Sequence, residues 1–528
     1  MQPSRRAAWR WTKSPLIDSV RHAGKGKRLS IDVNETLSTE ANTALRLVSG
    51  KGPEYLLPLR HPVRSVRALA SRQKSSPLPG PVGLPGIGVW REYNRDPAAY
   101  VRRAAQRYGD IFRLPLPMAD LVVLNHPKHY EITHIANDQR FSSLTSARME
   151  KFFGVIIGLT GTPTTNPRRI VDEINLQRRS QLVPILARRS LALVASTFVD
   201  EFIQRTAKWT EWADSGRTVD LQEAIAPVIL AAFLRSMCST EFSDDQMTQI
   251  DHDLRTLLAA GGSFGFAPTH IVEGTSPRQT VSALRRTLRT TAQMLDERLA
   301  SNVDHDDLLD KVLKFTGLNG RPLVRAELIY LLILLLTGGY DTLVASLSWM
   351  FGLLSLNPEP AERLYTEIDA LNGKVPAFDD LKLLPWTKAC FDEAQRLQGG
   401  PVHKTQAIVD VDIDGYHFPS GTVFGLGWTS MHRDERWWPN PDRYDPARFT
   451  DPAVVAARPK TAFVPFGVGK LACPGQAMAY ANAQLLSAVI LQRFRFSVPP
   501  GWQPKPLFAG STPVKGGVPV TVTRAANQ

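Results

Sequence analysis

The sequence predicts a mainly α-helical protein with small β-sheets. Helical patterns extend over 216–313, 326–356 and 476–494, whereas β-type runs are short and confined to 111–124 and 406–423. The chain has 528 residues, of which 43% are hydrophobic, so it can bury a large core. Single domains reach this length, and we expect one large helical domain.

A run of proline and glycine residues at 75–86 interrupts regular structure and marks the start of this domain. We expect residues 1–74 to form a basic, weakly ordered extension and residues 75–528 to form the folded domain. Arginines in the extension keep a mitochondrial presequence open, although Asp18 and Asp32 argue against one. The three cysteines are too scattered for a disulfide framework, so the simplest location is a reducing cytoplasm.

The net charge of +13 indicates acidic partners. Nucleic acid is not expected, because the basic residues are spread along the chain without an aromatic-basic repeat or a finger-type metal spacing. The longest apolar run, 328–336, is shorter than the about 20 residues needed to cross a bilayer. It is expected to belong to a buried helix, and we expect no transmembrane anchor.

The first part of the domain alternates regular and irregular segments. The spacing predicts a helix over 96–108 and a hairpin formed by 111–116 and 121–124. Segment 145–166 is rich in glycine and threonine and is expected to be irregular. A long helical stretch then begins among the arginines of 168–189.

Cys473 lies on a glycine-rich turn directly before the helical run 476–494. The free N–H groups and the positive dipole end at a helix N-terminus lower the pKa of a cysteine and favour its thiolate. Gly467 and Gly475 let the backbone approach a flat, bulky ligand, and Phe466 supplies an aromatic wall. A planar macrocycle with a central metal fits this description; an ordinary buried cysteine at a loop-to-helix junction is the alternative.

The apolar helical stretch 326–356 contains a second candidate site at its centre. Gly338 and Gly339 each cost about 1 kcal/mol relative to alanine in a helix interior. Asp341 followed by Thr342 is expensive to bury without partners. Such a local violation indicates function. The alternative is a helix kink in which the Asp–Thr pair satisfies nearby carbonyl groups.

The two motifs resemble those of the cytochrome P-450 family, in which the acid–alcohol pair also precedes the cysteine along the chain, and the resemblance extends from about Pro77 to the C-terminus. It implies the family's fold, a triangular prism with haem b between a long central helix and the helix after the cysteine loop. It also implies that Cys473 is the axial thiolate ligand of the haem iron. Asp341 and Thr342 would assist oxygen activation with protons and a hydrogen bond. The residues expected to line the haem are Phe466, Gly467 and Gly475.

Two positions depart from the family pattern for holding the haem propionates. The family has Trp or His four residues before an arginine, whereas this chain has Asn175 before Arg179. The family also has Arg or His two residues before the cysteine, whereas this chain has Leu471. Arg179 alone can still bind a carboxylate through a bidentate ion pair; a solvated basic face is the alternative. The other candidate propionate partners are Lys470, His403 and Lys404.

The resemblance also assigns structural and substrate-binding residues. Glu393 and Arg396 are spaced i and i+3 on one helical face, and with Arg448 they match the family's structural triad, which serves folding and haem retention. Taken alone, such a pair is common on protein surfaces. The loop near Phe152 covers the substrate in the family, so Phe152 and Tyr340 are candidate pocket residues; a surface loop with its own apolar plug is an equal alternative for Phe152.

The resemblance implies a monooxygenase that inserts one atom of O2 into an apolar organic substrate, which the sequence does not specify. The chain has no glycine-rich dinucleotide-binding turn, and its three cysteines cannot bind a four-cysteine iron–sulfur cluster. Electrons are therefore expected from an external ferredoxin or flavodoxin-type reductase chain. Two alternatives stay open. The first is a haem-thiolate enzyme that uses peroxide or rearranges a hydroperoxide, against which the Asp341–Thr342 pair argues. The second is a non-catalytic haem-binding paralogue, which the departures at Asn175 and Leu471 keep open.

Overall fold

A computed structural model of the chain describes ten segments. The predicted extension, 1–74, and the loop that carries Phe152 lie outside the described residues. The described segments are 78–85, 87–116, 120–136, 140–143, 167–262, 277–301, 303–318, 320–400, 402–508 and 511–525.

The described chain is mainly helical, as the sequence predicts. Its α-helices are α5 (Trp90–Arg95), α6 (Pro97–Tyr108), α7 (Pro127–Tyr130), α9 (Pro167–Ile185), α10 (Arg188–Thr206), α11 (Trp209–Ser215), α12 (Leu221–Cys238), α13 (Asp244–Gly262), α14 (Pro277–Ser301), α15 (Leu308–Leu313), α16 (Arg325–Leu356), α17 (Pro358–Asp369), α18 (Pro385–Gln398), α19 (Trp428–His432), α20 (Pro452–Ala457) and α21 (Gln476–Leu491). Single-turn and short helices of other types are the π-helix η2 (Glu131–Ala136) and the 3-10 helices η4 (Phe378–Leu383), η5 (Pro446–Phe449), η6 (Lys460–Ala462) and η7 (Gly469–Leu471).

Small sheets accompany the helices. The strands are β1 (Ile111–Pro115), β2 (Asp120–Leu124), β3 (Phe141–Ser143), β4 (Thr218–Asp220), β5 (His403–Ala407), β6 (Val411–Ile413), β7 (Tyr416–Phe418), β8 (Val423–Leu426), β9 (Phe494–Ser497) and β10 (Pro519–Arg524). They form sheets of order β1-β2-β8-β5-β3, β4-β10-β9 and β6-β7. Strands β2 and β8 are parallel, and the other neighbours are antiparallel. The predicted hairpin is confirmed, since Ile111 pairs with Leu124.

Two predicted helical segments need correction. The stretch 216–313 begins with strand β4, because Val219 pairs with Val520 of β10. The helix after the cysteine ends at Leu491 and does not reach 494. Phe494 and Phe496 are buried on one face of β9 while their neighbours are more exposed, and this alternation is typical of a strand.

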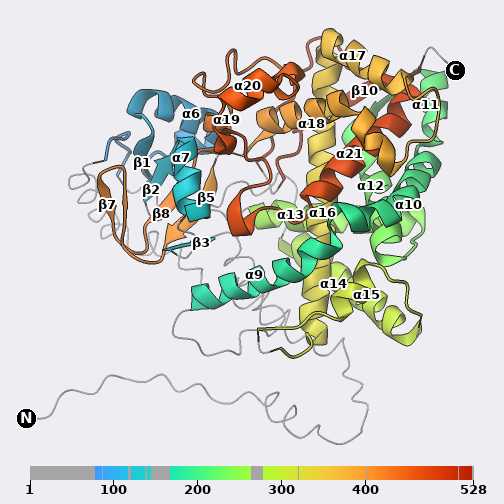
Figure 1. Cartoon of the computed structure of the whole chain (residues 1–528), viewed down its shortest axis with the longest axis horizontal. Coiled ribbons are helices and arrows are strands. Elements are labelled where there is room, and N and C mark those ends of the chain that lie inside the picture. Colours follow the sequence, from blue (N-terminus) through green and yellow to red (C-terminus); the bar gives the residue numbers. More distant parts are fainter. Residues whose placement is uncertain are drawn as a thin grey trace, which may run out of the picture.

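Helix α16 runs through the middle of the helical part, beside α21, while the five-stranded sheet lies to one side (Figure 1). It packs against α12, α14, α18 and α21. Most of its side chains are buried, including those of Leu331, Leu347 and Met350, which are completely enclosed. Burial on all sides explains why this helix is apolar around its whole circumference.

Two helices are long and apolar enough to span a bilayer, contrary to the expectation drawn from the apolar run 328–336. By length and hydropathy, α12 and α16 could each cross a membrane, and the bent pair of helices from 173 to 215 would pass the same test as one broken span. In the protein, 83% of the apolar window of α12 and 61% of that of α16 are buried among other elements. Packing inside the helical part accounts for this apolar character without lipid.

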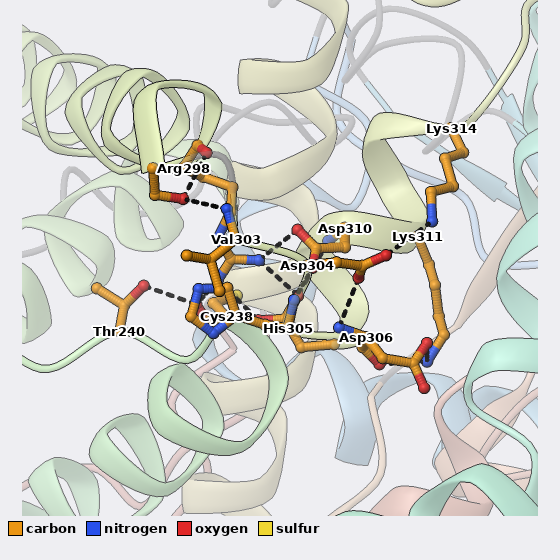
Figure 2. A network of polar contacts seen from close by, with 12 residues as sticks. Cys238, Thr240, Arg298, Val303, Asp304, His305, Asp306, Asp310, Lys311 and Lys314 are labelled. Carbon is orange, nitrogen blue, oxygen red and sulfur yellow. Dashed lines mark hydrogen bonds and ion pairs between the residues drawn. The ribbon is translucent and has the colours of Figure 1, made fainter.

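Helices α13 and α14 pack against each other and against α16, and a buried arginine anchors one end of α14. Arg298 of α14 donates to Asp310 of α15 at 2.6 Å and to the Cys238 carbonyl at the end of α12 at 2.6 Å (Figure 2). It also forms a bidentate pair with Asp307, with both distances 2.8 Å. One guanidinium therefore fixes three helices at a single corner.

Candidate functional site

The cysteine loop is a tight turn closed by backbone hydrogen bonds. The Cys473 N–H donates to the Phe466 carbonyl at 2.7 Å, and the Gly475 N–H donates to the Cys473 sulfur. Gly469 has a φ of 70°, and a Cβ at this position would collide with the His134 carbonyl of η2. The loop thereby presents the Cys473 sulfur at the N-terminus of α21.

The expected haem-lining residues adjoin this turn. Gly467 has a φ of 67°, a left-handed conformation that favours glycine. The ring of Phe466 packs against Tyr480 of α21, with ring centroids 5.2 Å apart. This contact fixes the start of the cysteine loop against α21.

The prediction that the pKa of Cys473 is lowered is wrong for the protein without a bound metal. Burial raises the pKa of the Cys473 thiol, although the Gly475 N–H and the Arg179 charge each lower it. Water reaches the side chain, but protein atoms crowd around the sulfur, and this desolvation outweighs the helix N-terminus. A bound metal cation would supply the charge that keeps a thiolate ligand deprotonated.

The three cysteines differ in their access to solvent. Cys238 and Cys390 are buried, whereas Cys473 is exposed. Burial raises the pKa of Cys238 to about 12 and also raises that of Cys390. Buried thiols of this kind are inert, so Cys473 is the cysteine available for a ligand.

Helix α9 brings an anion-binding pair to the cysteine loop. Asn175 and Arg179 lie one turn apart on the same helical face. Burial lowers the pKa of Arg179, and its electrostatic interaction with Cys473 raises it. Among the described residues, Arg179 Nη2 and Asn175 Nδ2 are buried and have no hydrogen-bond partner. Because unpaired buried donors are costly, both are suited to a carboxylate, and Asn175 joins Arg179 as a donor.

The centre of α16 opens at Gly338 and Thr342, although most of the helix is buried. The two residues are spaced i and i+4, so they share one face. A Cβ at Gly338 would have no neighbour within 4 Å, and Thr342 Oγ1 donates to the Gly338 carbonyl at 2.7 Å. On another face, a Cβ at Gly339 would lie 2.5 Å from the ring of Phe233. One glycine thus leaves open space, and the other permits close approach of α12.

Asp341 and Tyr340 point to different surroundings from Thr342. Burial raises the pKa of Asp341, an effect that the Ser511 hydroxyl and the Arg255 charge partly offset. An acid with a raised pKa carries its proton closer to neutral pH. Tyr340 is completely buried, and its hydroxyl accepts a hydrogen bond from Arg255 Nε at 3.4 Å. We therefore place Tyr340 in the core between helices rather than in a substrate pocket.

Sequence reasoning missed a charged network behind Asp341. Arg255 of α13 donates from Nε to Asp251 at 2.8 Å and pairs through Nη1 with Glu223 of α12. Burial, together with the charges of Glu223 and Asp341, raises the pKa of Asp251 to about 6, although Arg255 partly offsets the shift. The network joins α12, α13 and α16, and no local pattern in the sequence could have revealed it.

The structural triad is buried, unlike an ordinary surface pair. Glu393 and Arg396 are both fully enclosed, and Arg396 donates to both Glu393 oxygens at 2.6 and 2.8 Å. Arg396 also donates to the carbonyls of His432 and Pro441, each at 2.7 Å. Arg448 of η5 approaches Glu393 at 3.4 Å. The pair therefore ties α18 to the segment that leads towards the cysteine loop.

His403 and Lys404, two of the predicted propionate partners, lie on β5. His403 lies beside a histidine that the sequence analysis did not identify. The rings of His403 and His134 lie 5.0 Å apart, measured between centroids. The carbonyl of His134 also packs against Gly469 of the cysteine loop. Lys404 is the next residue of β5 and points to the opposite face of the strand. Lys470 is exposed on η7.

A separate cavity of about 230 Å³ lies between α12, α13, α14 and α16. Its lining includes Leu336 and the ion pair formed by Asp253 and Arg286. None of the site residues described above lines it, so this cavity is distinct from the cysteine site.

A helical fold in which an accessible cysteine loop lies near buried anion-binding donors, together with an acid–alcohol pair on a central helix, defines a haem-thiolate oxidoreductase. The family model described as "Cytochrome P450" matches residues 77–520. The chain therefore belongs to the cytochrome P450 family, and it is an oxidoreductase of the monooxygenase class.

Relatives of known name agree with this family. A Mycobacterium tuberculosis protein named "Putative cytochrome P450 132" is 28% identical over 75% of this chain and 86% of its own length. Pentalenene oxygenase of Streptomyces avermitilis is 26% identical over 81% of this chain and 93% of its own length. Cyclooctat-9-en-7-ol 5-monooxygenase of Streptomyces melanosporofaciens is 26% identical over 61% and 71%, respectively.

Proposed function

We propose that the protein inserts one atom of O2 into an apolar organic substrate, using haem b and electrons from a separate redox partner. The observation that carries the proposal is the setting of Cys473. Cys473 is exposed to solvent, its sulfur accepts a hydrogen bond from Gly475, and it interacts with the charge of Arg179. Arg179 in turn offers a buried guanidinium nitrogen that lacks a partner among the described residues.

The residues present fit a haem with its two carboxylates. Haem, when bound, supplies an iron that binds and reduces O2. Cys473 would ligate that iron, and the Gly475 N–H would stabilise the charge on its sulfur. Arg179 and Asn175 would hold one propionate through the donors that are otherwise unpaired. Gly338 would leave room at the centre of α16 where a side chain would intrude.

Proton delivery falls to α16 and the residues behind it. The Thr342 hydroxyl proton is held by the Gly338 carbonyl at 2.7 Å, and rotation about χ1 would release it towards the open face. Asp341, whose pKa burial raises, would supply the next proton. Asp251, with a pKa of about 6, lies near enough to Asp341 to interact with its charge and could replenish it.

The net charge of the chain and its few cysteines support a choice of redox partner and of cellular location. We assign electron supply to an external, acidic ferredoxin or flavodoxin-type chain, because the protein carries a net charge of +13. The cytoplasm fits the few cysteines and such a partner. The first substrate probes are pentalenene and cyclooctat-9-en-7-ol, the compounds that appear in the names of two relatives.

The proposal is tested by turnover of the holoenzyme with NADPH, a ferredoxin, its reductase and ¹⁸O2. Probes that shift the haem Soret band from low towards high spin are selected first. Wild type should yield product with one ¹⁸O atom. Thr342→Ala should still consume NADPH but release most of the electrons as hydrogen peroxide. Equal product per NADPH in both proteins, or turnover with hydrogen peroxide alone at the full rate, favours the peroxide-using alternative.

A further inference from the structure

Two histidines meet beside the cysteine loop, one from η2 and one from β5. We propose that His134 and His403 together hold one haem propionate, and that His134 takes up a proton to do so. This inference rests on the proposed function, because it requires that haem binds at Cys473. It assigns to His134 a role that no sequence motif indicates.

The position of His134 is set by the cysteine loop itself. Its carbonyl packs so closely on Gly469 that no other residue fits there. Its ring lies 5.0 Å from that of His403, with 39° between the ring planes. Gly469 begins η7, which also contains Leu471 in place of the family's basic residue. The histidine pair therefore stands next to the position where a propionate partner is missing.

Hydrogen bonding determines which nitrogen of His134 is available. Thr133 Oγ1 lies 2.6 Å from the His129 carbonyl, which can only accept, so the single hydroxyl proton goes there. Thr133 Oγ1 also lies 2.7 Å from His134 Nδ1 and must accept from it. The proton of a neutral His134 is thus on Nδ1, and Nε2 carries a lone pair. Binding a carboxylate through Nε2 requires a second proton and a charged ring.

The surroundings keep this pair neutral until an anion arrives. Burial, with a smaller contribution from the neighbouring His403, lowers the pKa of His134 to about 3. Burial also lowers the pKa of His403. The other titratable neighbours are Tyr130, which burial keeps neutral by raising its pKa, and Lys470 on the facing η7. No carboxylate among the described residues contributes to the pKa of either histidine.

A propionate would supply the missing negative charge. A carboxylate beside His134 favours the imidazolium and raises its pKa relative to the haem-free protein. The sign of the pH dependence follows: the contribution to haem retention is complete at low pH and is lost as pH rises through the pKa of His134 in the haem-bound state. Arg179 and Asn175 remain available for the second propionate.

The test measures haem transfer from the holoenzyme to excess apomyoglobin between pH 6 and pH 9. Wild type should lose haem faster as the pH rises. His134→Ala should lose haem about 10-fold faster or more at pH 6, as expected for a lost charge-assisted hydrogen bond, and its rate should not depend on pH. His134→Gln keeps an N–H donor near the Nε2 position but cannot charge, so its rate should be intermediate and also independent of pH.

Controls separate this inference from the proposed function. His417→Ala removes an exposed histidine and should match wild type. All variants should keep the ferrous carbonyl spectrum of a thiolate ligand; a wild type that binds no haem overturns the proposed function itself. The propionate bending modes in the resonance Raman spectrum should shift in His134→Gln. If His134→Gln, folded and loaded, shows wild-type release at every pH and unshifted modes, the inference is wrong.

Discussion

Single residues acquire their roles here from their immediate surroundings. Cys473 and Cys390 carry the same thiol, but Cys390 is fully enclosed between helices, whereas the cysteine loop leaves Cys473 open to solvent. Backbone geometry makes this difference, because the left-handed glycines on either side of Val468, Gly467 and Gly469, turn the loop outwards. The same reasoning separates Thr342, which faces open space, from Tyr340, which faces the core.

Replacing Cys473 by alanine should remove the red-shifted Soret band of the ferrous carbonyl complex, because no other described cysteine can reach a ligand. The measurement is a carbon monoxide difference spectrum of the reduced protein. Cys238→Ala and Cys390→Ala are the matched controls and should keep the band. A band that survives in Cys473→Ala would show that a different residue is the ligand.

Individual elements are shaped by the distances at which they pack. Helices α12 and α16 approach so closely at Gly339 that the ring of Phe233 fills the place of a side chain. One residue earlier, Gly338 has no such neighbour. Adjacent glycines in one helix therefore serve different purposes: one is required by packing and the other by the open face.

Replacing these glycines by alanine should separate the two purposes. Gly339→Ala should destabilise the protein by about 1–3 kcal/mol, because the new methyl group would force Phe233 and α12 to move. Gly338→Ala should leave the free energy of unfolding unchanged or raise it by about 1 kcal/mol, since alanine favours the helix. Urea unfolding of the haem-free proteins measures both. Equal destabilisation by the two substitutions would contradict the different surroundings.

At the scale of the whole molecule, buried charges connect helices that are distant in sequence. Arg255, Asp251 and Glu223 join α12 to α13, next to the centre of α16. Arg298 of α14 joins the C-terminal end of α12 to the start of α15. The helices that flank the site are thus held by ion pairs at two places, and their stability depends on pH.

Asp251 should give the protein a distinct pH dependence. Its folded-state pKa of about 6 lies above the ordinary value of 3.8. Between about pH 4 and pH 6, the folded state therefore binds more protons at Asp251 than the unfolded state does. The contribution of Asp251 to the free energy of unfolding therefore falls as the pH rises from about 4 to 6, by about 3 kcal/mol in total.

The measurement compares Asp251→Asn with wild type by thermal unfolding at several pH values. The variant cannot titrate, so its stability relative to wild type should increase across this window. Asp245→Asn, at an exposed position of the same helix, should follow the wild-type curve. A constant difference between Asp251→Asn and wild type from pH 4 to pH 6 would show that Asp251 is not buried as described.

The sequence by itself determined the elements and the family. Periodicity located α16 and the β1–β2 hairpin within a residue or two, because apolar spacing is a local property of the chain. The motif around Cys473 and the Asp341–Thr342 pair indicated the family, which the match over residues 77–520 confirms. These signals need no information about distant neighbours.

Only the tertiary structure decided which polar groups face one another. In the structure, Tyr340 lies in the core, although the sequence had suggested a pocket residue. Asn175 is a donor beside Arg179, and His134 lies next to His403. The tertiary structure also reversed the expected pKa shift of Cys473, because desolvation depends on every atom packed around the sulfur. Burial and pairing arise between residues hundreds of positions apart, and they act through distance in space, which the order of residues along the chain does not specify.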